Sequence, residues 1–396
     1  AVAVVRHRIE AIKTAGSMAQ MANDAIQMAS NRQIPNVPDK EDILEMHDKS
    51  FESVEESPRS KYKRTYNVQP LNLNNISENE RWIENGVDIT KRLSKYQEKS
   101  IKANQKDDRN ISEIRALSLI CIFYFGKRDM VIPSQDIRLE RDMLRPAASS
   151  LLSRWTTEIE QCLQQETPDI WQIRSSINKF QSTAIERRDS FLFSFTNVLG
   201  ICAGVQDSDE RKISEDTLVH TYLHAPLHML FVEDSIFGHK WANTALEATR
   251  HNDKVLLPDF TVFKSTSGYK YDLFVVEVKR PGSSISDLYK IGAMLKKMIN
   301  ELVILGVRRP CVCGLLVEGF ICTSYRLDLK AKHVYRLVEL REFRLPNNGF
   351  DLGCLPLAMQ ALQQIKNIVS SMAQEIEVSV NARMEKTMIR SRVPES

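Results

Sequence analysis

Three charged residues stand inside short segments that are otherwise apolar, where a charge is costly. Asp259 follows Pro258 at the start of one such segment, and Glu277 and Lys279 lie in the next, around Val278. Side chains alternate along a strand, so Glu277 and Lys279 point to the same face. A buried charge requires a partner or a metal ion. These residues are therefore the first candidates for chemistry.

Metal-assisted hydrolysis of a phosphodiester is the reaction that this set of groups fits. Asp259 and Glu277 offer carboxylate oxygens to Mg²⁺ or Mn²⁺, and the backbone carbonyl of Val278 is a candidate third ligand. Such a metal polarises the phosphoryl oxygen and lowers the pKa of a bound water. The ammonium of Lys279 offsets negative charge in the transition state. The alternative is that Asp259 caps a turn while Glu277 and Lys279 form a surface ion pair on an edge strand.

The surrounding sequence predicts an α/β domain that positions these residues. A turn at 265–268 separates the two candidate strands, and Pro281-Gly282 ends the second one. Helical spacing of apolar residues then predicts a buried helix face. In chain order we expect a helix at 214–232, strands at 257–264 and 271–279, a helix at 286–305, strands at 311–324 and 333–345, and a helix at 355–388.

The pattern Pro258-Asp259 followed by Glu277-Val278-Lys279 resembles the PD-(D/E)XK nuclease superfamily, which has a restriction-endonuclease-like α-β-β-β-α-β core. The resemblance implies that the acid of the first motif lies on the second strand and the Glu-x-Lys on the third. The first helix of the family often carries an acid; Glu215 occupies that place here, with Asp216 as the fallback. The segment is also similar to expanded nuclease-like proteins of early-diverging fungi, which share the Ser-Glu-x-Thr helix start and the Glu-Val-Lys strand.

The resemblance implies a divalent-metal-dependent nuclease that hydrolyses DNA or RNA. Because the superfamily includes members without activity, the alternative is an inactive nuclease-fold module that binds nucleic acid or protein. A third hypothesis, from another functional class, is a helical interaction protein whose α/β part serves only as a scaffold. Function belongs to the site and not to the scaffold. Metal-dependent cleavage would distinguish the nuclease from the other two hypotheses, and salt-dependent nucleic-acid binding without cleavage would favour the inactive module.

Basic residues favour a nucleic-acid partner for the α/β segment. Residues 259–346 contain 15 Lys or Arg and 9 Asp or Glu, a balance of +6, whereas the whole chain carries only +3. A phosphate-facing surface is one interpretation, and an ordinary solvated helix face is the other. The candidate nucleic-acid-binding residues are Lys279, Arg280, Lys290, Lys296, Lys297, Arg308 and Arg309.

Three histidines recur at four-residue steps, at His220, His224 and His228. Such spacing occurs in zinc sites on helices. However, Pro226 interrupts the helix and no acidic ligand follows at helical spacing, so we favour a partly buried set that packs beside the core.

The domain organisation predicted from these patterns has four parts. They are a helix and polar linker at 1–76, a helical N-terminal domain at 77–205, the nuclease-like domain at 211–346, and a C-terminal helix and tail at 347–396. The apolar run 116–125 is expected to form a buried helix, so the N-terminal region is predicted to be all-α. Its helices are candidates for contact with a protein partner. The basic cluster at 59–64 is read as a solvated linker, with phosphate contact or nuclear import as the alternative.

The thiols and the apolar runs indicate an intracellular chain, in the cytoplasm or the nucleus. The seven cysteines are odd in number and form no Cys-x-x-Cys pair, which is typical of a reducing compartment. No apolar run approaches the ~20 residues that a membrane span requires, and the first residues contain no apolar run suited to a secretory signal.

Overall fold

The computed structural model describes Leu73, Ile132 and residues 76–105, 111–127, 137–205, 212–242, 244–250, 255–283 and 286–392, with side chains to Met384. The chain divides into two compact units, 1–62 and 63–396, and all described residues belong to the second. The predicted helix at 1–31, nearly all of the predicted linker, and the basic cluster at 59–64 lie outside the described residues.

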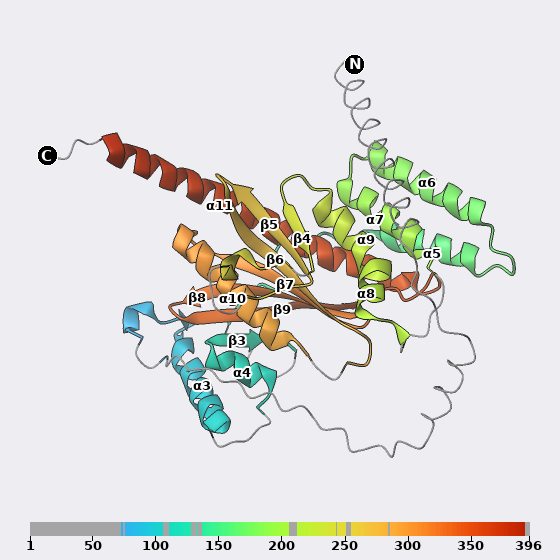
Figure 1. The fold of residues 1–396 in the computed structure, drawn as a ribbon. Helices are drawn as coiled ribbons and strands as arrows, with labels where there is room; N and C mark the ends of the chain where they lie inside the picture. Colours follow the sequence, from blue (N-terminus) through green and yellow to red (C-terminus); the bar gives the residue numbers. More distant parts are fainter. Residues whose placement is uncertain are drawn as a thin grey trace, which may run out of the picture. The chain divides into compact units, whose positions relative to one another are not determined.

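A seven-stranded mixed sheet forms the centre of the second unit (Figure 1). Its order is β3-β9-β8-β7-β6-β5-β4; the pairs β6/β7 and β3/β9 are parallel and the others antiparallel. Its strands are rich in β-branched and aromatic residues, which pack well on a pleated surface. They are β3 (Ile122–Phe125), β4 (Gly238–Trp241), β5 (Phe260–Thr266), β6 (Tyr269–Lys279), β7 (Cys311–Glu318), β8 (Ile321–Ala331) and β9 (Val334–Arg344).

One face of the sheet is covered by α10 (Leu288–Leu305), which connects the parallel strands β6 and β7. Parallel neighbours cannot be joined by a tight turn, so a crossover helix is required. The helix ends at Gly306, whose φ of +97° suits glycine. α4 (Glu113–Leu119) packs on α10 so closely that Gly292 leaves room for the side chain of Leu117.

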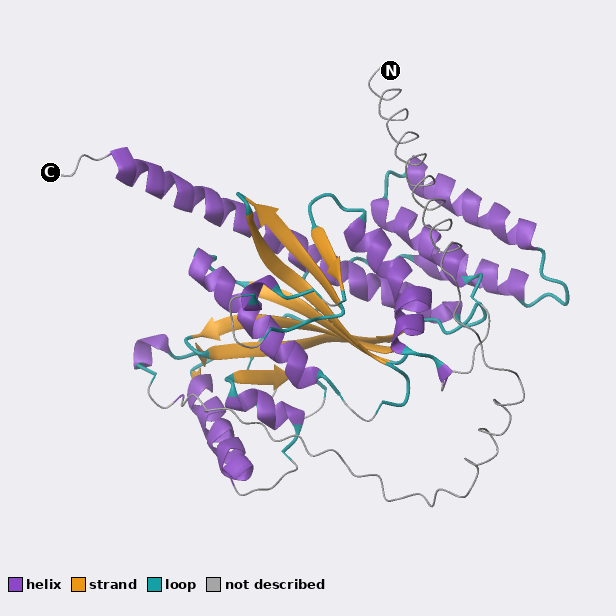
Figure 2. Cartoon of the chain, viewed as in Figure 1, coloured by secondary structure: helices purple, strands orange, loops and turns teal. Residues whose placement is uncertain are grey.

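The opposite face is covered by α11 (Leu355–Arg392), which crosses the sheet and extends beyond it (Figures 1 and 2). Behind it pack α5 (Ser150–Leu163), α6 (Ile170–Glu186) and α7 (Ser190–Cys202). A further helix runs from Glu215 to Val232 as α8 (Glu215–Thr217), η5 (Leu218–Leu223), α9 (His224–Leu227) and η6 (His228–Val232). η5 and η6 have the wider π-helical turns, on either side of Pro226, which lacks a backbone N–H.

The predicted buried helix at 116–125 is corrected by the structure. α4 ends at Leu119, and Cys121 takes the left-handed φ of +61°, which reverses the chain. Ile122–Phe125 then pairs in parallel with β9. Ile-Phe-Tyr-Phe is a sequence of strand formers, and pairing at the sheet edge outweighs continuation of the helix. The N-terminal region is therefore not all-α, and it also contains a small hairpin of β1 (Ile83–Glu84) and β2 (Val87–Asp88), followed by α3 (Ile89–Gln105).

Segments that were predicted as separate domains pack together within the second unit. β3 and α4 come from the predicted helical domain at 77–205, yet they belong to the sheet and to the layer around α10. α5 and α7 pack against α11, which comes from the predicted C-terminal segment. The chain is a mixed α+β protein, and no helix among its described residues is long and apolar enough to cross a membrane.

Candidate metal-dependent active site

Asp259 and Glu277 lie side by side where β5 begins and β6 ends. Asp259 directly precedes β5, and its backbone N–H donates to the carbonyl of Val276 at 3.1 Å. Its Oδ2 accepts a hydrogen bond from the backbone N–H of Val278 at 2.7 Å. One contact of its backbone and one of its carboxylate therefore hold Asp259 against the end of β6.

Glu277 is fully buried and faces α10. Its Oε2 accepts a hydrogen bond from Lys290 Nζ at 2.6 Å, while Oε1 has no hydrogen-bond partner among the described residues. Burial raises the pKa of Glu277 to about 7; the ammonium of Lys290 opposes this shift, and the charges of Asp259 and Asp287 add to it. This carboxyl group is thus only partly ionised near neutral pH, and one of its oxygens lacks the partner that burial demands.

The electrostatics of Asp259 link it to the same cluster. Burial raises the pKa of Asp259, against the lowering effects of the Val278 N–H and of Lys290 and Lys279. Lys290 also donates to the carbonyl of Leu257 at 3.1 Å, two residues before Asp259. One cation therefore connects the approach to β5 with the buried carboxylate on β6.

Lys279 pairs with an acid that the sequence analysis did not single out. Its Nζ lies 2.9 Å from Oδ2 of Asp287, which is buried at the N-terminal cap of α10. Burial lowers the pKa of Lys279, but the hydrogen bond and charge of Asp287, with Glu215 and Glu277, raise it overall. Lys279 therefore stays protonated. An acid at a helix start after Pro281-Gly282 is the signal that could have identified Asp287.

Glu215 lies at the same end of the sheet. It begins the helix that Ser214 caps, and its Oε1 is 3.4 Å from the backbone N–H of Arg280. The charge of Glu215 acts on both Asp259 and Lys279. The neighbouring Asp216 is also exposed, with no described contact to the cluster.

The two carboxylates suit a hard divalent cation. No group of three or more His, Cys, Asp or Glu side chains among the described residues is arranged to hold a metal. Mg²⁺, however, needs only one or two carboxylates and keeps several waters. The unpartnered Oε1 of Glu277 is an oxygen suited to this role. The carbonyl of Val278 points to the same strand edge as its N–H, which donates to Asp259.

The structure does not bring the predicted basic surface together. Lys296 turns inward: its Nζ donates to the carbonyl of Ile120 at 2.7 Å, and burial lowers its pKa. Lys297 is exposed on α10. Arg308 and Arg309 precede β7, roughly 20 Å along that strand from the end that pairs with Lys279.

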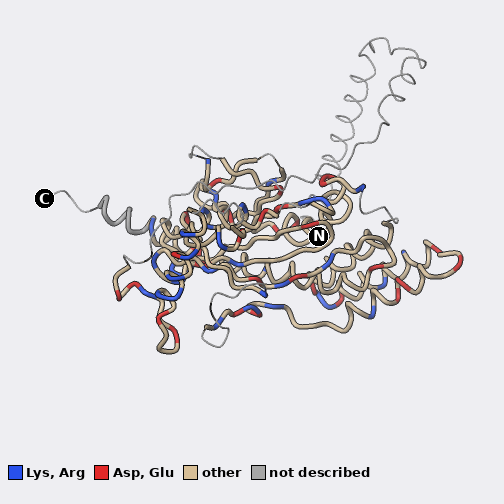
Figure 3. Tube along the Cα trace, turned by 90° about the horizontal axis from the view of Figure 1, so that it is seen from below, with Lys and Arg blue, Asp and Glu red and all other residues tan. Residues whose placement is uncertain are grey.

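Only Lys279, Arg280 and Lys290 remain at the candidate site. Along the described chain, Lys and Arg are interspersed with Asp and Glu (Figure 3). The sequence left open a phosphate-facing surface and an ordinary solvated helix face. The structure places a small basic group at the site and a separate one at the far end of the sheet.

The histidines form a packed column of rings. The ring of His224 stacks between His228, at 5.3 Å between centroids, and Trp241, at 5.2 Å. Burial, with the nearby His228 and His220, lowers the pKa of His224. The set packs against the start of β5 through Trp241 and Phe260, whose centroids are 4.4 Å apart.

Comparisons with protein-family models, with curated proteins and with solved structures found no match for this chain.

Proposed function

We propose that the protein is a divalent-metal-dependent nuclease that hydrolyses phosphodiester bonds in DNA or RNA. The observation that carries the proposal is the Glu277 carboxylate. It is fully buried, has one oxygen without a hydrogen-bond partner in the part of the chain that the structure describes, and lies beside the carboxylate of Asp259 and near the cations Lys279 and Lys290. A buried acid with a strongly shifted pKa in a cluster of charges is typical of an active site.

The order of elements around these residues supports a restriction-endonuclease-like core. A helix at 215–232 precedes an antiparallel meander of β4, β5 and β6, and α10 then leads to the parallel strand β7. This is the order α-β-β-β-α-β. Asp259 directly precedes the second of these strands and Glu277-Val278-Lys279 ends the third, as the PD-(D/E)XK resemblance implies.

Mg²⁺ or Mn²⁺, held by Asp259, Glu277 and the carbonyl of Val278, would polarise the scissile phosphate and lower the pKa of the attacking water. Glu215 is close enough to the cluster to contribute through a bound water. The chain's own residues prepare the site. Lys290 favours the ionised form of Glu277, and Asp287 holds Lys279 protonated. Lys279 can then offset negative charge on the phosphate.

Charge beside the site favours approach of the nucleic acid from one side. A recess of about 250 Å³ at the start of α10 has Glu113, Glu318, Glu339 and Glu342 among its lining residues. A polyanion is repelled by such a lining. Arg280, exposed at the end of β6, lies at the candidate site itself. We therefore expect the phosphate backbone to run past Arg280 and the start of β5, away from the glutamates.

The test is cleavage of single- and double-stranded DNA and RNA with Mg²⁺ or Mn²⁺ and with a chelator. Wild type is compared with Glu277→Gln and with Glu375→Gln, which changes an exposed carboxylate on α11. The proposal requires metal-dependent cleavage that Glu277→Gln loses and Glu375→Gln keeps. Binding of nucleic acid without cleavage by folded wild type would refute the enzyme and favour the inactive binding module.

A further inference from the structure

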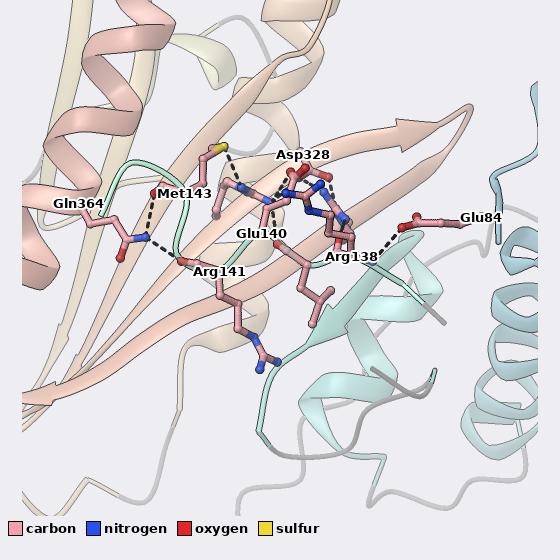
Figure 4. Close-up of polar contacts among 10 residues, drawn as sticks. Glu84, Arg138, Glu140, Arg141, Met143, Asp328 and Gln364 are labelled. Atoms are coloured by element: carbon pink, nitrogen blue, oxygen red, sulfur yellow. Dashed lines mark hydrogen bonds and ion pairs between the residues drawn. The ribbon is translucent and has the colours of Figure 1, made fainter. Parts of the chain in front are cut away.

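Two buried arginines share one carboxylate at the end of the sheet opposite to Glu277. Arg326 on β8 and Arg336 on β9 are 1% and 2% exposed. Arg336 makes two hydrogen bonds to Asp328, at 3.0 and 2.8 Å, and Arg326 Nη2 lies 3.1 Å from the same Asp328. Asp328, Glu140 and Met143, which are labelled in Figure 4, all contact Arg326.

The acids around the two buried arginines are more exposed than the arginines themselves. Asp328 has 16% of its side chain exposed and Glu140, 4.0 Å from Arg326, has 42%; the charges of Glu140 and Glu84 also act on Arg336. The remaining contacts are neutral: the carbonyls of Leu139 and Arg138 and the sulfur of Met143. Arg326 Nε is buried and has no hydrogen-bond partner among the described residues. A buried donor without an acceptor is costly, so Arg326 Nε favours a further acceptor.

A cavity opens directly onto these arginines. Its volume is about 600 Å³, a size suited to a small organic ligand. Arg308, Arg309 and Lys330 lie exposed at its mouth, and Arg326 and Arg336 form its floor. Asp328 and Glu140 are the acids among its lining residues, so cations outnumber acids five to two.

We propose that this cavity is a binding site for a phosphate-bearing anion, with a diphosphate or triphosphate group as the chemical class. Guanidinium groups bind phosphate through paired hydrogen bonds, and a cluster of them selects a multiply charged anion over a monovalent one. The site is distinct from the candidate nuclease site and does not depend on it, because it lies roughly 20 Å away along β7.

The experiment is calorimetric titration of the full chain with inorganic pyrophosphate in metal-free buffer at fixed ionic strength. The test variant is Arg308→Gln/Arg309→Gln, because both side chains are exposed and their loss leaves the buried cluster intact. The matched control is Lys95→Gln/Lys99→Gln, which removes two exposed charges from α3. We expect saturable binding by wild type, at least tenfold weaker binding by the test variant, and an unchanged control.

Glu277→Gln should bind pyrophosphate as wild type does, whether or not the chain is a nuclease. If a nucleoside triphosphate displaces pyrophosphate and a 5′-phosphorylated oligonucleotide does not, the natural ligand is a free small molecule. Displacement by a 5′-phosphorylated oligonucleotide, but not by its 5′-hydroxyl form, assigns a nucleic-acid end. Absence of saturable binding by wild type, or equal affinity of the Arg308→Gln/Arg309→Gln variant, would overturn the proposal.

Discussion

Replacing Glu277 with Gln should change how the stability of the protein depends on pH. Burial raises the pKa of Glu277 from 4.5 to about 7. Between these two values the folded state keeps a proton that the unfolded state releases. The unfolded state therefore binds fewer protons, and the contribution of Glu277 to stability falls as pH rises through this window. The glutamine side chain in the variant does not titrate, so the stability of the variant does not fall for this reason as pH rises.

The magnitude follows from the size of the shift. A difference between 4.5 and about 7 corresponds to about 3 kcal/mol at ~1.36 kcal/mol per pKa unit. The attraction between Lys290 and ionised Glu277 is already included in this pKa, and the remaining differences between the Glu and Gln side chains give an offset that does not change with pH. The free energy of unfolding of the variant minus that of wild type should therefore rise by about 3 kcal/mol from pH 4.5 to pH 8.

Urea denaturation of both proteins at several pH values measures this difference. Titrating groups whose pKa does not depend on the charge of Glu277 cancel when the free energies are subtracted. Asp259 is the acidic neighbour whose titration is coupled to that of Glu277. Glu318→Gln, which replaces an exposed carboxylate, is the control and should change by no more than about 0.5 kcal/mol. A difference between wild type and Glu277→Gln that stays flat with pH, or that falls as pH rises, would refute the reasoning about burial.

Four further predictions concern the cation site, two lysines beside it and one turn. Mg²⁺ binding favours ionised Glu277, so Mg²⁺ should raise the melting temperature of wild type more at pH 8 than at pH 6, and that of Glu277→Gln at neither pH. Lys290→Met should raise the pKa of Glu277 further, so the rate of cleavage against pH should shift to higher pH; Lys279→Met should instead lower kcat by about 10²–10³ at all pH values. Gly319→Ala should lower the free energy of unfolding in urea by about 1–2 kcal/mol, because Gly319 has a φ of +64° and an added Cβ would lie 3.1 Å from Pro281 Cα.

Local patterns in the sequence predicted the elements that carry the candidate site. The turn at Ser267-Gly268, with φ of +50° and +80°, separates β5 from β6 as expected. The apolar spacing of the segment 286–305 predicted α10 nearly to its ends. The strand expected at 311–324 is in fact two strands that turn at Gly319, a glycine whose role was not recognised.

Pairing between strands or charged residues that are distant in the chain could not be predicted from the sequence. Ile122–Phe125 is apolar enough for a helix or a strand, and only β9, more than two hundred residues later, decides between them. β4 is short and half-exposed, so it gave no periodic signal. The same limit applies to charge. The pairing of Lys279 with Asp287 and of Glu277 with Lys290 depends on how α10 lies on the sheet.

Basic residues that are close in sequence also lie on different parts of the structure. Lys296 and Lys297 are neighbours on α10, yet one packs against Ile120 and the other is exposed. Arg308 and Arg309 lie after the helix, where the chain has already crossed to the far end of the sheet. Counting charge over a segment detects basic character but not the face on which each cation lies.

The most direct test of the central claim is where a divalent cation binds. Crystals of the protein grown or soaked in Mn²⁺ at pH 8 would show the metal by its anomalous scattering. We expect one strong peak within coordination distance of the carboxylates of Asp259 and Glu277. A protein without a peak there, in which Glu277 remains bonded to Lys290 alone, would contradict the account of this cluster as a metal-dependent active site.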